Sequence, residues 1–245
     1  MTRVLLLGGT AEARELARRL HADDRFEVLS SLAGRVANPR LPVGDTRIGG
    51  YGGPSGLAEF LGGFDVLVDA THPFAATISR NAAEAAGRVG VPLLALVRPP
   101  WSPGPGDRWT AVPTVAAAAA ELAGRTPARV LLTTGRQDVG EFAALEKHWF
   151  LVRVVDAPSG PLPPHHELLR DRGPYILESE QTLLRENAID VLVTKNSGGD
   201  LVSAKLTAAR ELGLDVIVVD RPPRPDAVPT VPTAADAYER LVIGL

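Results

Sequence analysis

The chain opens with Val4-Leu-Leu-Leu-Gly-Gly-Thr10, and the same plan returns 126 residues later as Val130-Leu-Leu-Thr-Thr-Gly-Arg136. An apolar run that ends in glycine is typical of a buried parallel strand that turns into a helix. Three further pairs match in the same order along the chain. They are Asp65–Asp69 with Asp190–Thr194, Arg98–Pro100 with Arg221–Pro223, and Val112–Thr114 with Val231–Thr233. The second half of the chain therefore repeats the plan of the first.

Each half predicts its own open α/β sheet. In the first half we expect strands at 3–7, 26–30, 46–48, 66–69, 93–97 and 109–112, and helices at 11–21, 55–61, 75–89 and 114–124. In the second half we expect strands at 129–133, 149–155, 175–178, 190–194 and 215–219, and helices at 139–146, 180–188, 201–212 and 233–241. This alternation predicts two Rossmann-like, doubly wound parallel sheets. We expect domains at 1–126 and 127–245, although either sheet can accept the last strands.

The composition narrows the class of protein. The chain has 245 residues, which is long enough for two domains that each bury a core. A net charge of −3 argues against a general nucleic-acid binder, and the lack of cysteine excludes disulfides, thiol nucleophiles and cysteine-bound metals. No apolar run approaches the roughly 18 residues of a membrane helix, and the N-terminus leads directly into a strand, without room for a signal peptide. We therefore expect a cytoplasmic protein with no nucleic-acid, membrane or metal partner.

The first glycine turn is a candidate coenzyme site. In Gly8-Gly9-Thr10-Ala11-Glu12-Ala13, glycine lets the backbone approach a pyrophosphate, and the helix start adds partial positive charge. Gly8 and Ala13 fit the first and last positions of G-x-G-x-x-G/A, but Thr10 replaces the middle glycine. An ordinary tight turn is the alternative interpretation.

The end of the second strand indicates which coenzyme fits. NAD enzymes usually place an acidic residue there, whereas this chain has Ser30-Ser31-Leu-Ala-Gly-Arg35. Two hydroxyls and an arginine suit a 2′-phosphate, which favours NADPH over NADH. The alternative is that Arg35 is a solvated loop residue.

Two further segments of the first half are candidates for a ligand site. Asp69-Ala-Thr-His-Pro-Phe-Ala75 ends the fourth strand, where dinucleotide folds place the nicotinamide ring. Pro73 suits the first position of the next helix, and His72 then faces the ligand as a hydrogen-bond donor or proton source. The alternative for His72 is a packed or capping histidine. Gly49-Gly-Tyr-Gly-Gly53 predicts a loop that approaches a flat ligand, a hinge, or only an irregular turn.

The matching positions of the second half are cationic. Arg136 replaces Thr10; its bulk disfavours a dinucleotide, and its guanidinium can grip a carboxylate with two hydrogen bonds. Thr194-Lys-Asn-Ser-Gly-Gly199 replaces the segment at the end of the fourth strand, and Lys205 follows on the next helix. Surface lysines are the alternative. The second half therefore predicts a site for an organic polyanion.

Taken in order over nearly the whole chain, these segments resemble the precorrin-6A reductases of cobalamin (vitamin B12) synthesis. Asp-Ala-Thr-His-Pro-Phe-Ala and Thr-Lys-Asn-Ser-Gly-Gly are the specific parts of the resemblance. It implies NADPH-dependent reduction of a ring double bond of the tetrapyrrole precorrin-6A to precorrin-6B, by hydride transfer in an inter-domain cleft. The acetate and propionate arms of that substrate agree with a basic second half. A transient contact with the next enzyme of the pathway is a further expectation.

The expected roles divide between the two ligands. We assign coenzyme binding to Gly8, Gly9, Thr10, Ala11, Glu12, Ser31, Arg35 and Thr71. We assign substrate binding to Tyr51, His72, Arg98, Arg136, Lys195, Asn196, Ser197 and Lys205. His72 and Lys195 are the catalytic candidates for the proton donor, and a bound water is equally compatible with the sequence. The alternative functions are a cobalt-precorrin-6A reductase, a dihydrodipicolinate-reductase-like NAD(P)H enzyme, and a two-lobed binder without catalysis.

Overall fold

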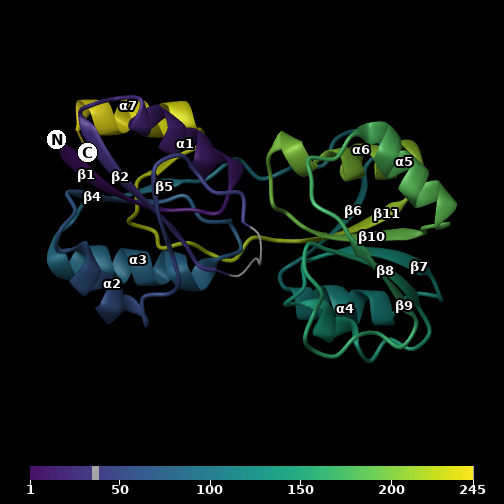
Figure 1. Cartoon of the computed structure of the whole chain (residues 1–245). Coiled ribbons are helices and arrows are strands. Elements are labelled where there is room, and N and C mark those ends of the chain that lie inside the picture. The colour runs from purple at the N-terminus through teal and green to yellow at the C-terminus, as the bar shows by residue number, and fades with distance from the viewer. Residues whose placement is uncertain (35–38, 245) are drawn as a thin grey trace. The chain divides into compact units, whose positions relative to one another are not determined.

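The structure, a computed structural model, describes residues 1–34 and 39–244. The chain forms two compact units, one of Met1–Pro99 with Pro223–Leu245 and one of Pro100–Pro222 (Figure 1). We call them the first and the second unit.

The first unit is built on a six-stranded sheet in the order β12-β5-β4-β1-β2-β3. Its strands are β1 (Thr2–Leu7), β2 (Phe26–Leu32), β3 (Asp45–Ile48), β4 (Val66–Asp69), β5 (Leu93–Leu96) and β12 (Thr230–Val231). All neighbours are parallel, and the order is that of the Rossmann fold. Helices α1 (Ala11–His21) and α7 (Ala234–Ile243) cover one face, and α2 (Pro54–Leu61) and α3 (Ala76–Val89) cover the other (Figure 1). The predicted fold class is confirmed for this half.

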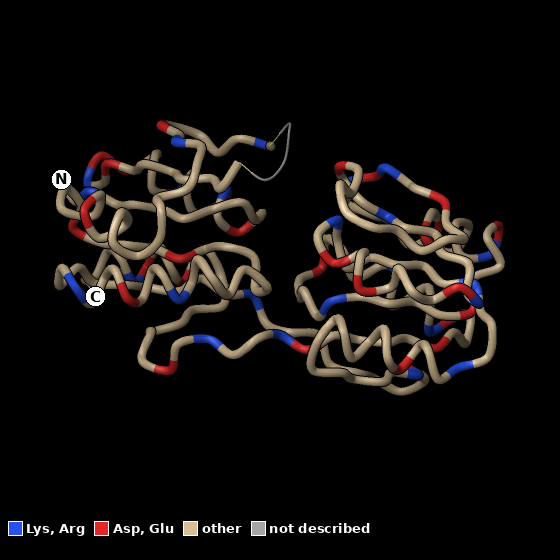
Figure 2. The backbone as a smooth tube through the Cα atoms, turned by 90° about the horizontal axis from the view of Figure 1, so that it is seen from below, with Lys and Arg blue, Asp and Glu red and all other residues tan. Residues whose placement is uncertain are grey.

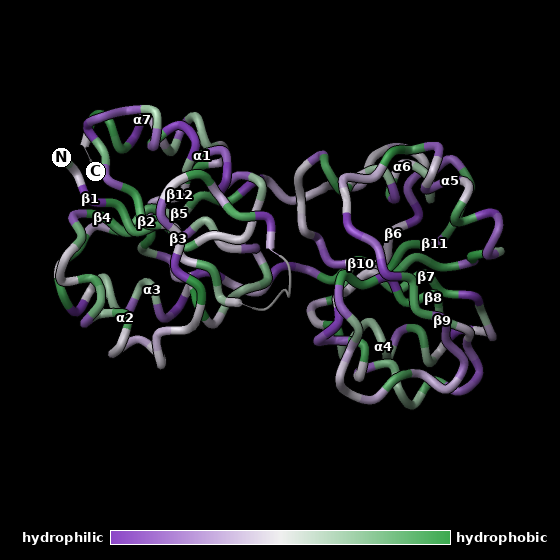
Figure 3. Tube along the Cα trace, viewed as in Figure 1, coloured by the Kyte–Doolittle hydropathy of each residue, from purple (hydrophilic) through white to green (hydrophobic). Residues whose placement is uncertain are grey.

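The apolar runs of the sequence become strands because both faces of the sheet are covered. Val4 and Leu6 pack with residues of α1 and α7, whereas Leu5 and Leu7 pack with residues of α2 and α3. All four are at most 2% exposed. A strand buried on both sides must be apolar throughout, and Figure 3 shows the hydrophobic strands inside more hydrophilic surroundings.

The second unit has the same strand order, β6-β11-β10-β7-β8-β9, again with parallel neighbours. Its strands are β6 (Arg108–Val112), β7 (Arg129–Thr133), β8 (Trp149–Val154), β9 (His166–Arg170), β10 (Val191–Lys195) and β11 (Asp215–Val219). Helices α5 (Leu177–Glu186) and α6 (Ala204–Glu211) lie on one face, and α4 (Val115–Ala123) and the short 3-10 helix η1 (Val139–Phe142) lie on the other (Figure 1). A second 3-10 helix, η2 (Asp200–Val202), precedes α6.

The two halves exchange their last strand, which corrects the predicted division at 126/127. β6 belongs to the first half of the sequence but pairs with β11 of the second unit, and β12 returns to pair with β5 of the first. The chain therefore crosses between the units after Pro99 and again after Pro222. Both crossings contain a double proline, which fixes an extended backbone and cannot donate to a sheet.

Several predicted elements are also corrected. The strand expected at 175–178 is wrong, because α5 begins at Leu177, and the edge strand β9 lies earlier in the chain. The helix expected at 139–146 is shortened to η1, and the one expected at 201–212 divides into η2 and α6. Pro73 does not begin a helix, since α3 starts three residues later at Ala76.

Charges of both signs are interspersed along the two units (Figure 2). Across 1–34 and 39–244, no helix combines the length and the apolar character that crossing a membrane requires.

Candidate functional site

The glycine turn after β1 has the shape expected for a dinucleotide site. Gly9 has φ +123°, and a Cβ added there would meet no atom within 4 Å, so the turn is open on that side. A Cβ on Gly8 would lie 3.4 Å from the Cβ of Ala13, so Gly8 allows helix and strand to pack closely. Gly8 N also donates to Ser31 O at 2.9 Å, which joins the turn after β1 to the end of β2.

Thr10 acts as the N-cap of α1. Its hydroxyl accepts a hydrogen bond from Ala13 N at 3.1 Å and donates one to Ala70 O at 2.9 Å. The side chain is thereby engaged within the protein, and it joins the turn after β1 to the turn after β4. The first backbone N–H groups of α1, which include those of Ala11 and Glu12, lack acceptors inside the helix and suit a phosphate.

Glu12 and Arg98 form an ion pair at this same edge of the first sheet. Arg98 Nη1 lies 2.8 Å from Glu12 Oε2, and both side chains are largely buried. Arg98 was predicted to bind substrate, yet it lies among the predicted coenzyme residues. Its charge balances Glu12, which would otherwise repel a phosphate at the start of α1.

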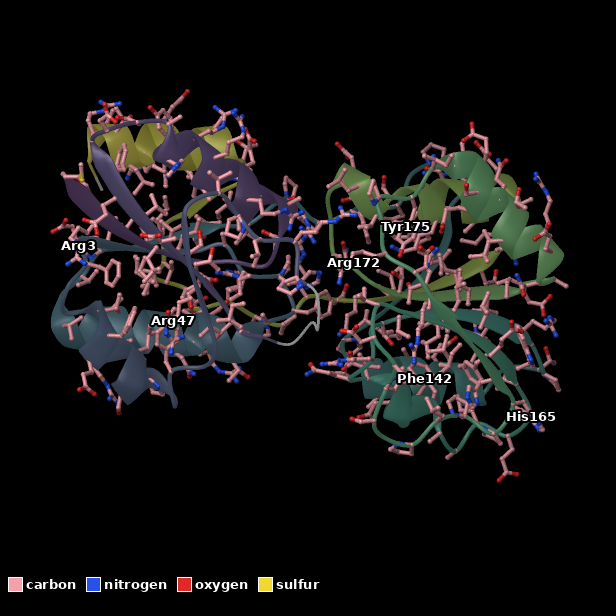
Figure 4. The ribbon with its side chains drawn as sticks, in the orientation of Figure 1. Arg3, Arg47, Phe142, His165, Arg172 and Tyr175 are labelled. Carbon is pink, nitrogen blue, oxygen red and sulfur yellow. The ribbon has the colours of Figure 1, made fainter. Side chains whose placement is uncertain are left out.

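Ser31 and Tyr51 also come together, although the sequence assigned them to different ligands. Tyr51 Oη donates a hydrogen bond to Ser31 Oγ at 2.7 Å. Arg47, which the sequence analysis missed, lies with its guanidinium 4.2 Å from the centre of the Tyr51 ring, and it donates to Gly49 O and Gly50 O, each at 2.7 Å. The labelled Arg47 can be found in Figure 4. Arg35 lies outside the described residues.

Burial raises the pKa of the Tyr51 phenol above its usual value. A phenol is already protonated at neutral pH at its usual pKa, and the shift is in the same direction, so Tyr51 can donate to Ser31.

The turn after β4 contains a buried polar cluster. Asp69 is 2% exposed and accepts hydrogen bonds from Thr71 Oγ1 at 2.6 Å and from Arg224 Nη2 at 2.7 Å. Arg224 follows the second double proline, so this contact anchors the second crossing where the chain re-enters the first unit. Thr71 was predicted to bind coenzyme, Asp69 was named only as the start of that segment without a role of its own, and Arg224 was not predicted. An aspartate at the end of an otherwise apolar strand was the signal that could have identified the cluster.

His72 has a defined hydrogen-bond direction. Its Nδ1 accepts from Phe74 N at 3.2 Å, and the two rings lie 5.9 Å apart. An accepting Nδ1 assigns the proton of the neutral ring to Nε2, so that His72 can act as a donor there.

In the second unit, the corresponding turn after β7 carries charge. Gly135 keeps a positive φ of +91°, and Arg136 Nη1 lies 3.8 Å from Asp156 Oδ2 with the arginine side chain 39% exposed. The ammonium group of Lys195, at the end of β10, pairs with the carboxylate of Asp138. The turns after β7 and β10 therefore both present a cation held by a carboxylate.

Asn196 and Lys205 hold the first crossing segment at Trp101. Asn196 Oδ1 accepts from Trp101 N at 2.8 Å, and its Nδ2 donates to Trp101 O at 3.0 Å. Lys205 is 5% exposed, with Nζ 4.8 Å from the Trp101 ring, and it donates to Val202 O at 2.8 Å. Both predicted substrate residues thus have partners inside the protein.

Arg221 stabilises the loop between these two residues. Its Nε donates to Asn196 O at 2.9 Å, and its Nη2 donates to Ser197 O at 3.1 Å. The backbone of Ser197 is thereby fixed after β10, next to Lys195.

The second unit also contains a buried ion pair that the sequence analysis missed. Arg153 on β8 pairs with both carboxylate oxygens of Glu180 on α5, and the two side chains are 3% and 2% exposed. The guanidinium lies 4.1 Å from the centre of the Tyr175 ring, which is labelled in Figure 4. Burial raises the pKa of Tyr175 as well.

Comparison with known proteins gives consistent matches. A family model described as Precorrin-6x reductase CbiJ/CobK matches residues 3–241. The precorrin-6A reductase of Rhodococcus erythropolis is 55% identical over 239 residues, covering 97% of this chain and 96% of that protein. A solved CobK precorrin-6A reductase structure is 45% identical with a TM-score of 0.92, covering 99% of this chain and 97% of that one. The cobalt-precorrin-6A reductase of Priestia megaterium is 30% identical over 233 residues, covering 89% of this chain and 90% of that protein.

Proposed function

The chain belongs to the precorrin-6x reductase CbiJ/CobK family, and we propose that it reduces precorrin-6A to precorrin-6B in cobalamin synthesis, with NADPH as coenzyme. The observation that carries the proposal is the difference between the two matching turns. Gly9 and Gly135 are equally open, but the next residue is Thr10, which caps α1, in the first unit and the cationic Arg136 in the second.

The residues of the first unit fit a pyridine nucleotide. The sheet has the Rossmann order, the glycine turn precedes a helix, and residues 31–34 at the end of β2 contain no carboxylate. In our proposal the backbone of Gly8, Gly9 and the first turn of α1 holds the pyrophosphate. Bound NADPH supplies the hydride for the reduction.

The turn after β4 would orient the reacting end of the coenzyme. Thr71 is fixed by Asp69, and the Nε2 proton of His72 is directed away from the contact with Phe74. We propose that His72 donates a hydrogen bond from Nε2 that orients a ligand. A neutral ring that gave up its only N–H proton would be left as an imidazolate, so we propose that Lys195 or a bound water delivers the proton to the ring carbon next to the reduced one.

The second unit would hold the substrate through its carboxylates. Arg136 and Lys195 now pair with Asp156 and Asp138, and we propose that the acid arms of the macrocycle replace these carboxylates as partners. Asn196 and Lys205 both contact Trp101. We therefore propose that these two residues shape the site, and that Arg136 and Lys195 contact the substrate. Catalysis then depends on bringing the two reacting carbons to about 3–3.5 Å from each other.

The test is a turnover assay with purified precorrin-6A under anaerobic conditions. We expect NADPH absorbance to fall as precorrin-6B forms, in equal molar amounts. Absence of turnover by folded protein would contradict the proposal. Ligand binding without NADPH oxidation would instead support the binder without catalysis, and activity on a small diacid would support the dihydrodipicolinate-reductase-like alternative.

A cobalt-containing substrate is the second candidate. The precorrin-6A relative is 55% identical and the cobalt-precorrin-6A relative 30%, which favours the metal-free substrate. Parallel assays with the two macrocycles would separate them through kcat/KM. A cytoplasmic location and a transient contact with the next enzyme are part of the same proposal.

A further inference from the structure

The end of β2 is where a Rossmann sheet meets the adenosine ribose of its coenzyme. In the first unit this position is occupied by Ser31, which pairs in register with Leu7, the last residue of β1. Ser31 is only 5% exposed. Its hydroxyl therefore belongs to the strand end at which the ribose of a bound coenzyme is expected.

Tyr51 determines the direction of that hydroxyl. A serine hydroxyl has one hydrogen to donate and lone pairs to accept with. The hydrogen bond from Tyr51 Oη, at 2.7 Å, occupies an accepting direction of Ser31 Oγ. The hydrogen of Ser31 is then turned away from Tyr51, toward another acceptor. A 2′-phosphate offers several acceptor oxygens, and it is the group that distinguishes NADPH from NADH.

Tyr51 is itself held in place by two separate features. The guanidinium of Arg47 stacks on its ring and also binds the backbone of the loop at Gly49 and Gly50. Gly56 of α2 lies against the backbone of Tyr51, since a Cβ there would be 1.9 Å from Tyr51 O. The stacked guanidinium also adds positive charge beside the phenol, which favours a phosphate.

The second unit differs at the same place. Leu132 pairs with Val152, so Arg153 is the residue of β8 that matches Ser31 in the repeat. Its guanidinium is bound by Glu180 and stacked on Tyr175. A large buried ion pair thus replaces a small hydroxyl at the position where a coenzyme ribose would bind.

We propose that Tyr51 is a positioning residue for coenzyme choice. It turns the Ser31 hydroxyl toward the 2′-phosphate, so that the first unit selects NADPH and the second unit, closed by Arg153, binds no coenzyme. This reassigns Tyr51 from the substrate to the coenzyme. The inference rests on the proposed function only in that the ligand is a pyridine nucleotide.

The test measures binding without catalysis. Adenosine 2′,5′-bisphosphate and adenosine 5′-monophosphate, titrated into the full chain by calorimetry, differ only in the 2′-phosphate. We expect the chain to prefer the bisphosphate and to bind one molecule of it. In Tyr51→Phe, which keeps the ring on Arg47, the preference should fall by about 3- to 10-fold, the range for one lost hydrogen bond. The matched control is Tyr238→Phe, which removes a phenol bound to Asp23 and should leave the preference unchanged.

A second variant tests whether Tyr51 acts through Ser31. If it does, Tyr51→Phe should cause no further loss of preference in a Ser31→Ala background. Additive losses, an unchanged preference in Tyr51→Phe, equal losses for both ligands, or two bisphosphates bound per chain would each overturn the proposal. If only the proposed function were wrong, the chain would still bind the bisphosphate selectively but would not reduce precorrin-6A. That result differs from every outcome that overturns the role of Tyr51.

Discussion

At the scale of single residues, Lys195 is the sharpest test of the substrate site. It ends β10 and pairs with Asp138, so its ammonium group is held in place before a substrate carboxylate arrives. We expect Lys195→Ala to weaken precorrin-6A binding by about 1.5–3 kcal/mol, as for a lost hydrogen bond to a charged group. The measurement is the KM for precorrin-6A at saturating NADPH.

Lys147→Ala provides the matched control for this variant. Lys147 is exposed and donates to Ala123 O at 2.8 Å, away from the turns after β7 and β10. Its removal should leave KM unchanged. Equal KM values for wild type and Lys195→Ala would place Lys195 outside the substrate site.

Individual residues were predictable where their neighbours are local in sequence. The glycines after β1 and the hydroxyls in the last residues of β2 could be located because each marks the end of a strand. Asn196 and Lys205 could not be understood in the same way, since their partner Trp101 lies about a hundred residues earlier. Arg153 and Glu180 also required the fold, because nothing local brings β8 and α5 together.

At the scale of elements, α2 and α3 offer a matched pair of helical glycines. A Cβ on Gly56 would lie 1.9 Å from the backbone oxygen of Tyr51, whereas a Cβ on Gly87 would meet no atom within 4 Å. We expect Gly56→Ala to lower the free energy of unfolding by about 1–3 kcal/mol, as overpacking does. Gly87→Ala should instead raise it by about 0.5–1 kcal/mol, through helix propensity.

Urea unfolding followed by circular dichroism would measure both variants. Because the clash in Gly56→Ala falls on the Tyr51 loop, the same variant should also weaken adenosine 2′,5′-bisphosphate binding. Equal stability of the two alanine variants would show that Tyr51 does not pack against α2 in this way.

The elements that the sequence misplaced are those with little burial. β9 is an edge strand without an apolar run, so its pattern did not differ from that of a loop. The segment 175–178 contains aromatic and branched residues that favour a strand, but there the chain enters α5. The buried central strands were predicted well, since burial on both faces imposes a continuous apolar run.

At the scale of the whole molecule, the repeat predicted two domains but not their true boundaries. The segments β6–α4 and β12–α7 follow the same sequence pattern, and that pattern does not specify which sheet receives the strand. The choice lies in distant contacts, such as those of Trp101 with Asn196 and Arg224 with Asp69. The first anchors its crossing segment to the end of β10, and the second anchors its segment to the end of β4.

This exchange makes a prediction about fragments. Residues 100–222 contain all six strands of the second sheet in one continuous piece, so we expect this fragment to fold alone. Residues 127–245 follow the sequence repeat instead, but they lack β6 and leave β11 as an unpaired edge. Residues 1–126 likewise lack α7, which contributes Ala234, Ala237 and Leu241 to the core on the α1 face. Cooperative thermal unfolding should therefore appear for 100–222 and be absent from 1–126 and 127–245. Folding of the two repeat halves, with 100–222 unfolded, would mean that the strands pair within each half and that the exchange does not occur.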